Sequence, residues 1–116
     1  MAELSSLTAS EVREGYLAKK FGVEEYLESV LARISETTEL NAFITVVDSE
    51  PLKSLAKKAQ VRIDSEKENS PFFTGIPVAI KDQIVTKGIK TTCGSKILHN
   101  FKVNYKIKQN QTIYLI

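Results

Sequence analysis

The sequence predicts an α/β fold in which a pair of helices is followed by a strand, a third helix and a second strand. Apolar residues recur at helical spacing over residues 7–21, 23–36 and 49–63. Two shorter runs, 42–47 and 76–81, are rich in the apolar and β-branched residues that favour strands. A helix between two strands indicates a crossover connection, so we expect both strands to belong to an incomplete mixed or parallel sheet.

The two N-terminal helices have recognisable boundaries. Thr8 is placed as an N-cap, and Glu11 three residues later completes a capping box at the start of the helix over 7–21. Gly22 is placed as the C′ residue that ends this helix. Because only this short break precedes the helix over 23–36, we expect the two helices to form an antiparallel pair.

The third helix lies between the two predicted strands. Residues 42–47, Ala-Phe-Ile-Thr-Val-Val, form the first strand, and Asp48 then offers a cap with Pro51 in the first helical turn. The apolar stripe of this helix consists of Leu52, Leu55, Ala56, Ala59 and Ile63. A polar linker over 66–70 separates the helix from the second strand.

Residues 75–82, Gly-Ile-Pro-Val-Ala-Ile-Lys-Asp, are the most informative stretch because an apolar run ends abruptly in a lysine and an aspartate. Such a run is typical of a strand covered on both faces. Desolvation at the end of that strand would lower the pKa of the Lys81 amine and let it exchange protons near neutral pH. The alternative from spacing alone is a lysine whose stem packs on the sheet edge while its ammonium reaches water.

Further motifs surround this stretch in a fixed order. Residues 91–98 read Thr-Thr-Cys-Gly-Ser-Lys-Ile-Leu, residues 100–101 read Asn-Phe, and residues 40–45 read Leu-Asn-Ala-Phe-Ile-Thr. Together with residues 75–82, this arrangement resembles the amidase signature family, most closely its tRNA-dependent amidotransferase members, over about residues 5–105. The resemblance implies an N-terminal fragment of the amidase signature fold.

The resemblance also implies a mechanism. Lys81 matches the catalytic lysine of a Ser–cis-Ser–Lys triad, in which the neutral amine takes a proton through a bridging serine so that a second serine attacks the amide. It implies glutamine as the substrate and other amidotransferase subunits as partners. It implies no cofactor in this chain, because ATP and Mg²⁺ would belong to a partner subunit. The residues do not distinguish a glutamyl-tRNA from an aspartyl-tRNA branch.

The two serines of that triad have no counterpart in the sequence. Ser95 is the only serine after Lys81, and it belongs to the Thr-Thr-Cys-Gly-Ser segment, which matches neither catalytic serine. We therefore expect the chain to be inactive alone. A truncated reading frame and a split gene both remain open. We expect residues 1–101 to be the N-terminal part of an amidase domain and residues 102–116 to be a divergent basic tail containing Gln and Asn.

Four residues near Lys81 carry smaller predictions. Asp82 is expected to anchor the loop that follows it, and Gln83 stands where the family usually has Asn, with a functional and a solvent-facing role both open. Cys93 is expected to be a small buried filler. His99 has no partner at metal-ligand spacing, so no metal site is expected.

Composition narrows the function classes. The 116 residues are 42% hydrophobic and 26% charged with a net charge of +2, which is too small to indicate nucleic-acid or membrane binding. The absence of a secretory signal and of an apolar run of about 18 residues predicts a cytoplasmic protein. The alternative function is a non-catalytic α/β interaction module that docks a partner through the helices at 7–36.

Overall fold

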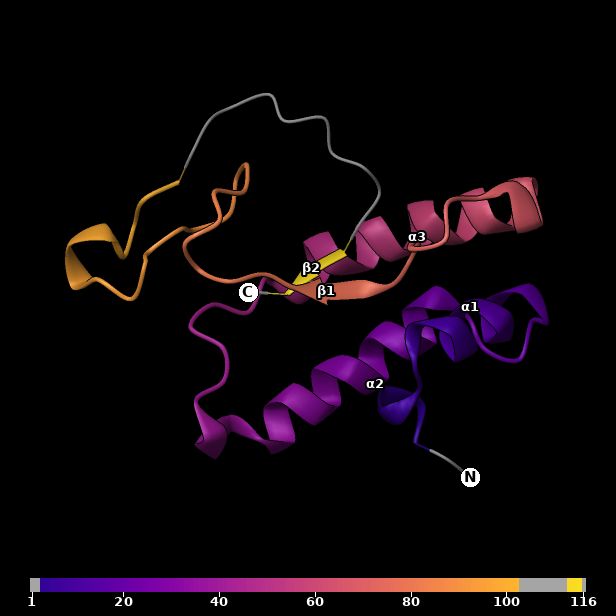
Figure 1. Ribbon diagram of the computed structural model, residues 1–116, viewed down its shortest axis with the longest axis horizontal. Coiled ribbons are helices and arrows are strands. Elements are labelled where there is room, and N and C mark those ends of the chain that lie inside the picture. Colours follow the sequence, from indigo (N-terminus) through magenta and orange to yellow (C-terminus); the bar gives the residue numbers. More distant parts are fainter. Residues whose placement is uncertain (1–2, 103–112, 116) are drawn as a thin grey trace.

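The computed structural model describes residues 3–102 and 113–115, and these residues are mostly helical (Figure 1). The helices are α1 (Ala9–Leu17), α2 (Val23–Glu36) and α3 (Ser49–Glu66). The strands are β1 (Pro77–Ala79) and β2 (Ile113–Leu115), which pair in parallel with Pro77 opposite Ile113. Short 3₁₀ turns occupy Leu4–Ser6, Thr38–Leu40, Lys67–Asn69 and Lys96–Leu98.

The predicted start of α1 is confirmed, and its predicted end is wrong. The Thr8 hydroxyl accepts from the Glu11 N–H over 3.3 Å, and the Glu11 carboxylate accepts from the Thr8 N–H over 2.8 Å. The helix ends at Leu17 in a Schellman motif whose left-handed C′ residue is Lys19, with φ of 55°. Gly22 is instead the N-cap of α2. The C′ residue of α1 is therefore Lys19, three residues before Gly22, which the sequence predicted for that position.

Replacement of Lys19 by glycine is expected to stabilise the protein by about 0.5–1 kcal/mol, because a left-handed conformation strains every residue with a Cβ. The Lys19 N–H donates to the Tyr16 carbonyl over 3.1 Å, a bond that glycine retains. Urea denaturation measures the change. Lys20→Gly is the matched control: Lys20 does not have a positive φ, so only the entropic cost of glycine should appear. A loss of stability in Lys19→Gly equal to that in Lys20→Gly would contradict the assignment.

The core lies where α2 crosses α3. Helix α2 makes its most extensive helix contact with α3, so the predicted antiparallel pairing of the first two helices is replaced by this one. The apolar stripe predicted for α3 is confirmed in four of its positions, which are buried with the inner faces of α1 and α2. The core consists of Val12, Tyr16, Val23, Tyr26, Leu27, Leu52, Ala56, Ala59, Ile63 and Ile76. Figure 1 shows β1 and β2 together in the space between α2 and α3, with β2 on the side of α3.

The predicted strand over 42–47 is wrong, and the predicted strand over 76–81 is shorter than expected. Residues 42–47 form no ladder and have no backbone hydrogen bond to any other residue that the structure describes. A strand requires a neighbour to pair its N–H and C=O groups, and the other predicted strand instead pairs with β2. The strand–helix–strand crossover of a mixed sheet is therefore not formed by residues 42–81.

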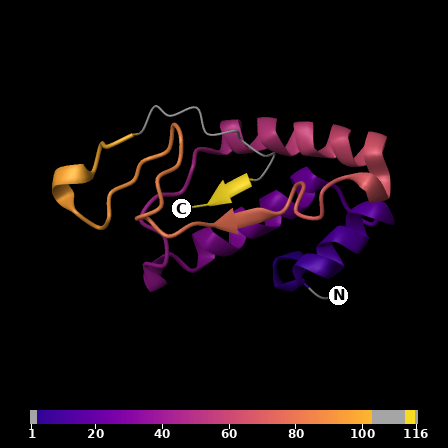
Figure 2. The ribbon, with the colours of Figure 1, turned by 45° about the horizontal axis from the view of Figure 1, so that its top comes forward.

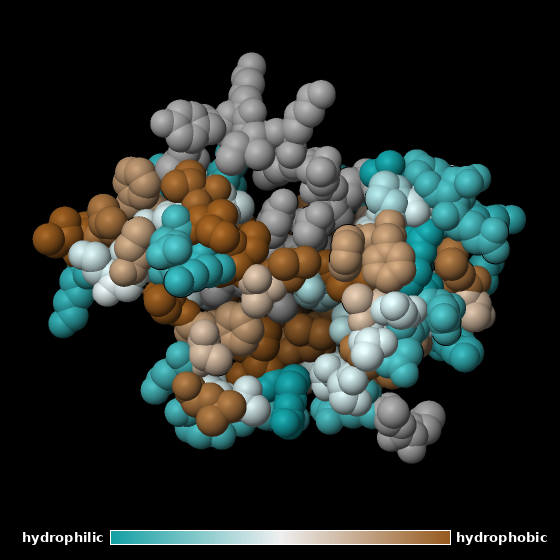
Figure 3. Space-filling view, viewed as in Figure 1, coloured by the Kyte–Doolittle hydropathy of each residue, from teal (hydrophilic) through white to brown (hydrophobic). Residues whose placement is uncertain are grey.

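Residues 80–102 form a long loop that projects from the end of β1 away from the helices (Figure 2). Apolar side chains gather on the surface toward this end of the molecule (Figure 3). Exposed large apolar residues of the loop and of the segment before α3 are Ile44, Val46, Ile84, Val85, Ile97 and Phe101. Within the described residues, none of the helices has the length and apolar character that crossing a membrane requires.

Candidate active site

The start of β1 is held in place by Tyr16 and Gly75. The Tyr16 hydroxyl donates to the Gly75 carbonyl over 2.8 Å, and burial raises the pKa of this hydroxyl. Gly75 has φ of 77°, and a Cβ built on it would lie 2.9 Å from a Val23 methyl carbon. The turn therefore requires glycine twice over, for its backbone conformation and for its close approach to the core. Both contacts fix where the chain enters β1, six residues before Lys81.

Gly75→Ala is expected to destabilise the fold by about 2–3 kcal/mol, because it adds left-handed strain and a clash with a fully buried valine. Thermal and urea unfolding measure the loss. Gly88→Ala is the matched control: its φ is 74°, but nothing lies within 4 Å of its Cβ position. Equal losses in both variants would show that backbone strain, and not the approach to Val23, decides the effect.

Lys81 follows β1 by two residues and is exposed. It begins a turn in which the Ile84 N–H donates to the Lys81 carbonyl over 2.9 Å, and Gln83 within this turn is also exposed. The described part of the chain therefore positions Lys81 at the end of a strand but does not enclose it. Enclosure of the amine, which the sequence predicted from a doubly covered strand, needs groups beyond those described.

Asp82 closes the base of the loop that follows it, as predicted. The Thr92 hydroxyl donates to the Asp82 carboxylate, and the Thr92 N–H donates to the same carboxylate over 2.8 Å. The Asp82 carbonyl also accepts from the Cys93 N–H over 2.9 Å. These bonds join the residue after Lys81 to the Thr-Thr-Cys-Gly-Ser segment. The hydrogen bonds from the Thr92 hydroxyl and N–H lower the pKa of the Asp82 carboxyl below its ordinary value.

This contact gives the loop a predicted pH dependence. Because the pKa of Asp82 is lower in the folded state than in the unfolded chain, its stabilising contribution is complete above the unfolded value and is lost as the pH falls through the folded value. We expect wild type to be more stable than Asp82→Asn at about pH 6, and the difference to shrink as the pH falls below the ordinary pKa of an aspartyl carboxyl, about 4. Urea denaturation of both proteins across this range tests it. A difference that is constant with pH would contradict it.

Cys93 is exposed, so the prediction of a buried filler is wrong. Cys93 and Gly94 have φ of 51° and 70°, and the Ser95 N–H donates to the Thr92 carbonyl over 2.8 Å. This is the geometry of a type I′ turn, whose first central residue directs its side chain outward. Among the described residues, no backbone hydrogen bond joins Ser95, the last residue of this turn, to Lys81.

Residues on both sides of this turn pair with each other and close the loop. The Thr91 N–H donates to the Phe101 carbonyl over 3.0 Å, and Lys90 and Lys102 form an isolated antiparallel bridge. Thr91 is buried, and its hydroxyl has no hydrogen-bond partner among the described residues. His99 is exposed. No group of three His, Cys, Asp or Glu side chains in the described ranges is arranged to hold a metal ion.

Arg13 is a buried residue that sequence reasoning missed. Its side chain is 7% exposed, and the guanidinium donates to the carbonyls of Lys67, Glu68, Ser70 and Pro71 and to the Ser70 hydroxyl, over 2.7–3.3 Å. Its place three residues before Tyr16, on the same helical face, is the signal that could have indicated burial. Arg13 therefore holds in place the end of α3 and the linker to β1, the strand that Lys81 follows.

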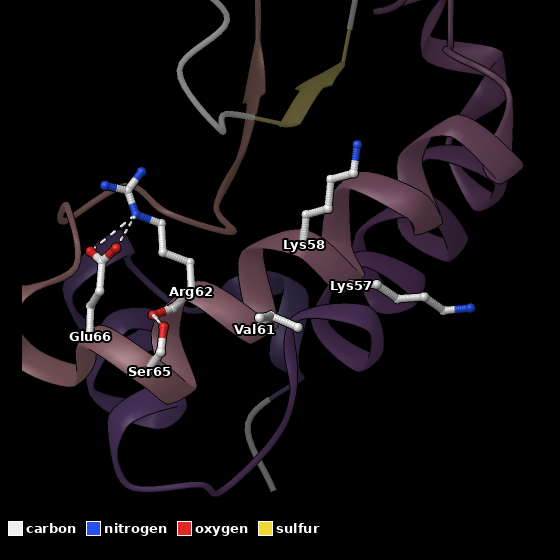
Figure 4. Close-up of a pocket in the computed structure, with 6 residues that line it drawn as sticks. All are labelled: Lys57, Lys58, Val61, Arg62, Ser65 and Glu66. Atoms are coloured by element: carbon white, nitrogen blue, oxygen red, sulfur yellow. Dashed lines mark hydrogen bonds and ion pairs between the residues drawn. The ribbon is translucent and has the colours of Figure 1, made fainter.

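A shallow depression of about 540 Å³ lies elsewhere, on the outer surface of α3 (Figure 4). Its lining residues all belong to this one helix, and Arg62 and Glu66 among them pair over 3.1 Å. The depression includes no residue of β1 or of the loop after it. It is therefore a groove between side chains of one helix and not part of the site around Lys81.

The fold and the strand-terminal lysine define a portion of an amidase-type domain. A family model described as amidase matches residues 25–108, and the chain belongs to the amidase family. It is 41% identical over 104 residues to the A subunit of the glutamyl-tRNA(Gln) amidotransferase of Agathobacter rectalis, covering 89% of this chain and 20% of that protein. The corresponding protein of Geotalea daltonii is 42% identical over 100 residues, covering 85% of this chain and 20% of that protein.

A solved chain from work on a vestigial protein complex and the origins of an s-triazine catabolic enzyme has the same fold. The TM-score is 0.76 at 24% identity, over 94% of this chain and 25% of the solved chain. The chain thus spans about a fifth of the length of the curated relatives it matches. The predicted relationship to the amidase signature family is confirmed.

Proposed function

We propose that this chain is the lysine-bearing portion of an amidase that hydrolyses the side-chain amide of glutamine and supplies ammonia for tRNA-dependent amidation. The observation that carries the proposal is the family match across residues 75–82, in which Lys81 follows β1 by two residues. The names of the relatives support the reaction, and their designation as subunits supports partner subunits. ATP and Mg²⁺ would act in such a partner, and not at this chain.

In the proposed reaction, Lys81 is the base. Its neutral amine takes a proton through a bridging serine hydroxyl, and a second serine attacks the glutamine amide carbon. The C–N bond breaks, an acyl-serine forms, and the proton returns from Lys81 to the departing ammonia. Water then releases glutamate from the serine. Ser95 is the only serine after Lys81 in this sequence and matches neither catalytic serine, so the test of the proposal supplies both hydroxyls on a second polypeptide.

The test is a mixing experiment. The second polypeptide is the Agathobacter rectalis relative without the part that matches this chain. Each polypeptide is incubated with glutamine alone and then together, and released ammonia is measured. We expect release from the mixture and none from either component. Ammonia release by this chain alone, or none from a mixture in which the two polypeptides bind, would contradict the proposal.

A further inference from the structure

The turn that carries Lys81 is tied to the Thr-Thr-Cys-Gly-Ser segment by three hydrogen bonds. The Thr92 hydroxyl and N–H both donate to the Asp82 carboxylate, and the Cys93 N–H donates to the Asp82 carbonyl over 2.9 Å. Among the described residues, no other hydrogen bond joins residues 81–83 to a segment distant in sequence. We call these three bonds the Asp82–Thr92 clasp.

The Thr92 hydroxyl is the centre of the clasp. It donates to one carboxylate oxygen of Asp82 and accepts from the Gly94 N–H over 3.2 Å. Thr92 is 6% exposed, so water competes little for these bonds. A valine would fill similar space but could neither donate nor accept, whereas a serine would keep both bonds. The clasp therefore depends on a hydroxyl at residue 92.

The Asp82 carboxylate is an acceptor in the clasp and not a proton donor. One of its oxygens accepts from the Thr92 N–H over 2.8 Å, and the other accepts from the Thr92 hydroxyl. The hydroxyl bond first, and then the N–H bond, lower the pKa of this carboxyl by favouring its ionised form. An ionised carboxylate has no proton to give to a reaction near neutral pH, so its role here is to hold the chain.

The clasp acts on Lys81 through the backbone. Lys81 precedes Asp82, and its carbonyl accepts from the Ile84 N–H over 2.9 Å, so hydrogen bonds fix the chain on both sides of the peptide bond after Lys81. Before β1, the bond from the Tyr16 hydroxyl to the Gly75 carbonyl fixes the entry of the chain. The stem of a lysine is flexible, so the backbone decides where the amine can reach. A misplacement of about 1 Å in a reacting group can cost about 100-fold in rate.

We infer that Asp82 and Thr92 are positioning residues for Lys81, which hold the chain that carries the amine and do not contact the substrate. The inference rests on the proposed function, in which Lys81 is the base. Loss of the clasp would leave the amine present but less well oriented toward the serine hydroxyl. The effect should therefore fall on kcat, while the KM for glutamine changes little.

The experiment compares three variants in the mixture with the remainder of the Agathobacter rectalis relative. Thr92→Val removes the hydroxyl and is expected to lower kcat by about 30-fold, with a KM within about three-fold of wild type. Thr92→Ser keeps the hydroxyl and should retain kcat within about three-fold. Thr86→Val is the matched control in the same loop, because the Thr86 hydroxyl donates to the Ile84 carbonyl, two residues away. It should retain kcat within about two-fold.

The conditions of this assay separate orientation of the amine from a general loss of structure. The second polypeptide is present at saturation for each variant, and the temperature lies well below every unfolding transition. Neither weaker binding nor partial unfolding then lowers kcat. A loss of kcat in Thr92→Ser or Thr86→Val equal to that in Thr92→Val would overturn the inference, and so would a loss that appears in KM alone.

A second readout reports the placement of the Lys81 amine without any reaction. In the bound mixture, an amine-reactive reagent should label Lys81 of Thr92→Val at least about five-fold faster than Lys81 of wild type, because the turn opens more often. If wild type binds but releases no ammonia, the proposed function is wrong. In that mixture, faster labelling in Thr92→Val would still support the positioning role, and equal labelling would overturn it.

The clasp itself is measured in the chain alone by amide hydrogen exchange. The Cys93 N–H donates to the Asp82 carbonyl, so it should exchange at least about 10-fold faster in Thr92→Val than in wild type. Thr86→Val should leave this rate within about two-fold of wild type. Equal rates in Thr92→Val and wild type would show that the Thr92 hydroxyl does not hold the turn, which would overturn the inference whatever the mixture does.

Discussion

Arg13→Ala is expected to destabilise the fold by about 3–4 kcal/mol, because it removes five hydrogen bonds of a buried guanidinium, two of them buried and three part-buried. The acceptors follow the C-terminus of α3, where the helix dipole also favours a cation. Domains of this size are stable by about 5–15 kcal/mol, so the loss would leave a large unfolded population. Urea denaturation at constant temperature measures it.

Arg62→Ala is the matched control. Arg62 is also an arginine on a helix, but it faces solvent and pairs only with Glu66, over 3.1 Å, among the described residues. Exposed pairs spaced four residues apart contribute about 0.3–0.5 kcal/mol. Arg13→Lys keeps the charge and loses the planar fork of donors, so we expect an intermediate loss. If Arg13→Ala lies within about 1 kcal/mol of Arg62→Ala, the assigned role of Arg13 is wrong.

Lys81→Ala is expected to lower ammonia release by the mixture by at least about 10³-fold, because a proton relay that acts as a unit fails when one member is removed. The loss should fall on kcat, since the proposed amine contacts the serine hydroxyl and not the bound amide. Steady-state kinetics with glutamine separate kcat from KM.

Lys87→Ala is the control in the same loop, with the same loss of one positive charge. It should retain activity within about two-fold of wild type, as surface substitutions away from reacting groups usually do. If a mixture of the Lys81→Ala chain with the second polypeptide keeps more than about a tenth of the wild-type activity, Lys81 is excluded as the base. Normal binding of this variant to the second polypeptide would show that the loss is chemical.

Local patterns predicted much of this structure. The capping box of Thr8 and Glu11 involves residues three apart, and the stripe of α3 depends on one helical period. The anchoring role of Asp82 could be inferred because a carboxylate that precedes a loop commonly accepts N–H groups from it. Each of these features is decided within a short segment, where sequence and structure correspond closely.

The failed predictions depend on partners distant in sequence or on unusual backbone conformations. Residues 42–47 have strand composition, but a ladder needs a neighbour that the described chain does not supply. Arg13 is buried because the end of α3, more than fifty residues later, returns to it. Lys19 and Cys93 adopt left-handed conformations that are usually taken by glycine, so α1 ended early and the cysteine was exposed.

The most direct test of the central claim is site-resolved labelling of lysines with an amine-reactive reagent, read by mass spectrometry. In the chain alone, Lys81 is exposed and should react at a rate within about three-fold of Lys58, which is exposed on α3. When the second polypeptide binds, we expect the labelling of Lys81 to slow by about 10-fold or more, because Lys81 enters an enclosed active centre. The labelling rate of Lys58 should stay unchanged. Unchanged labelling of Lys81 in a mixture that has demonstrably bound would contradict it.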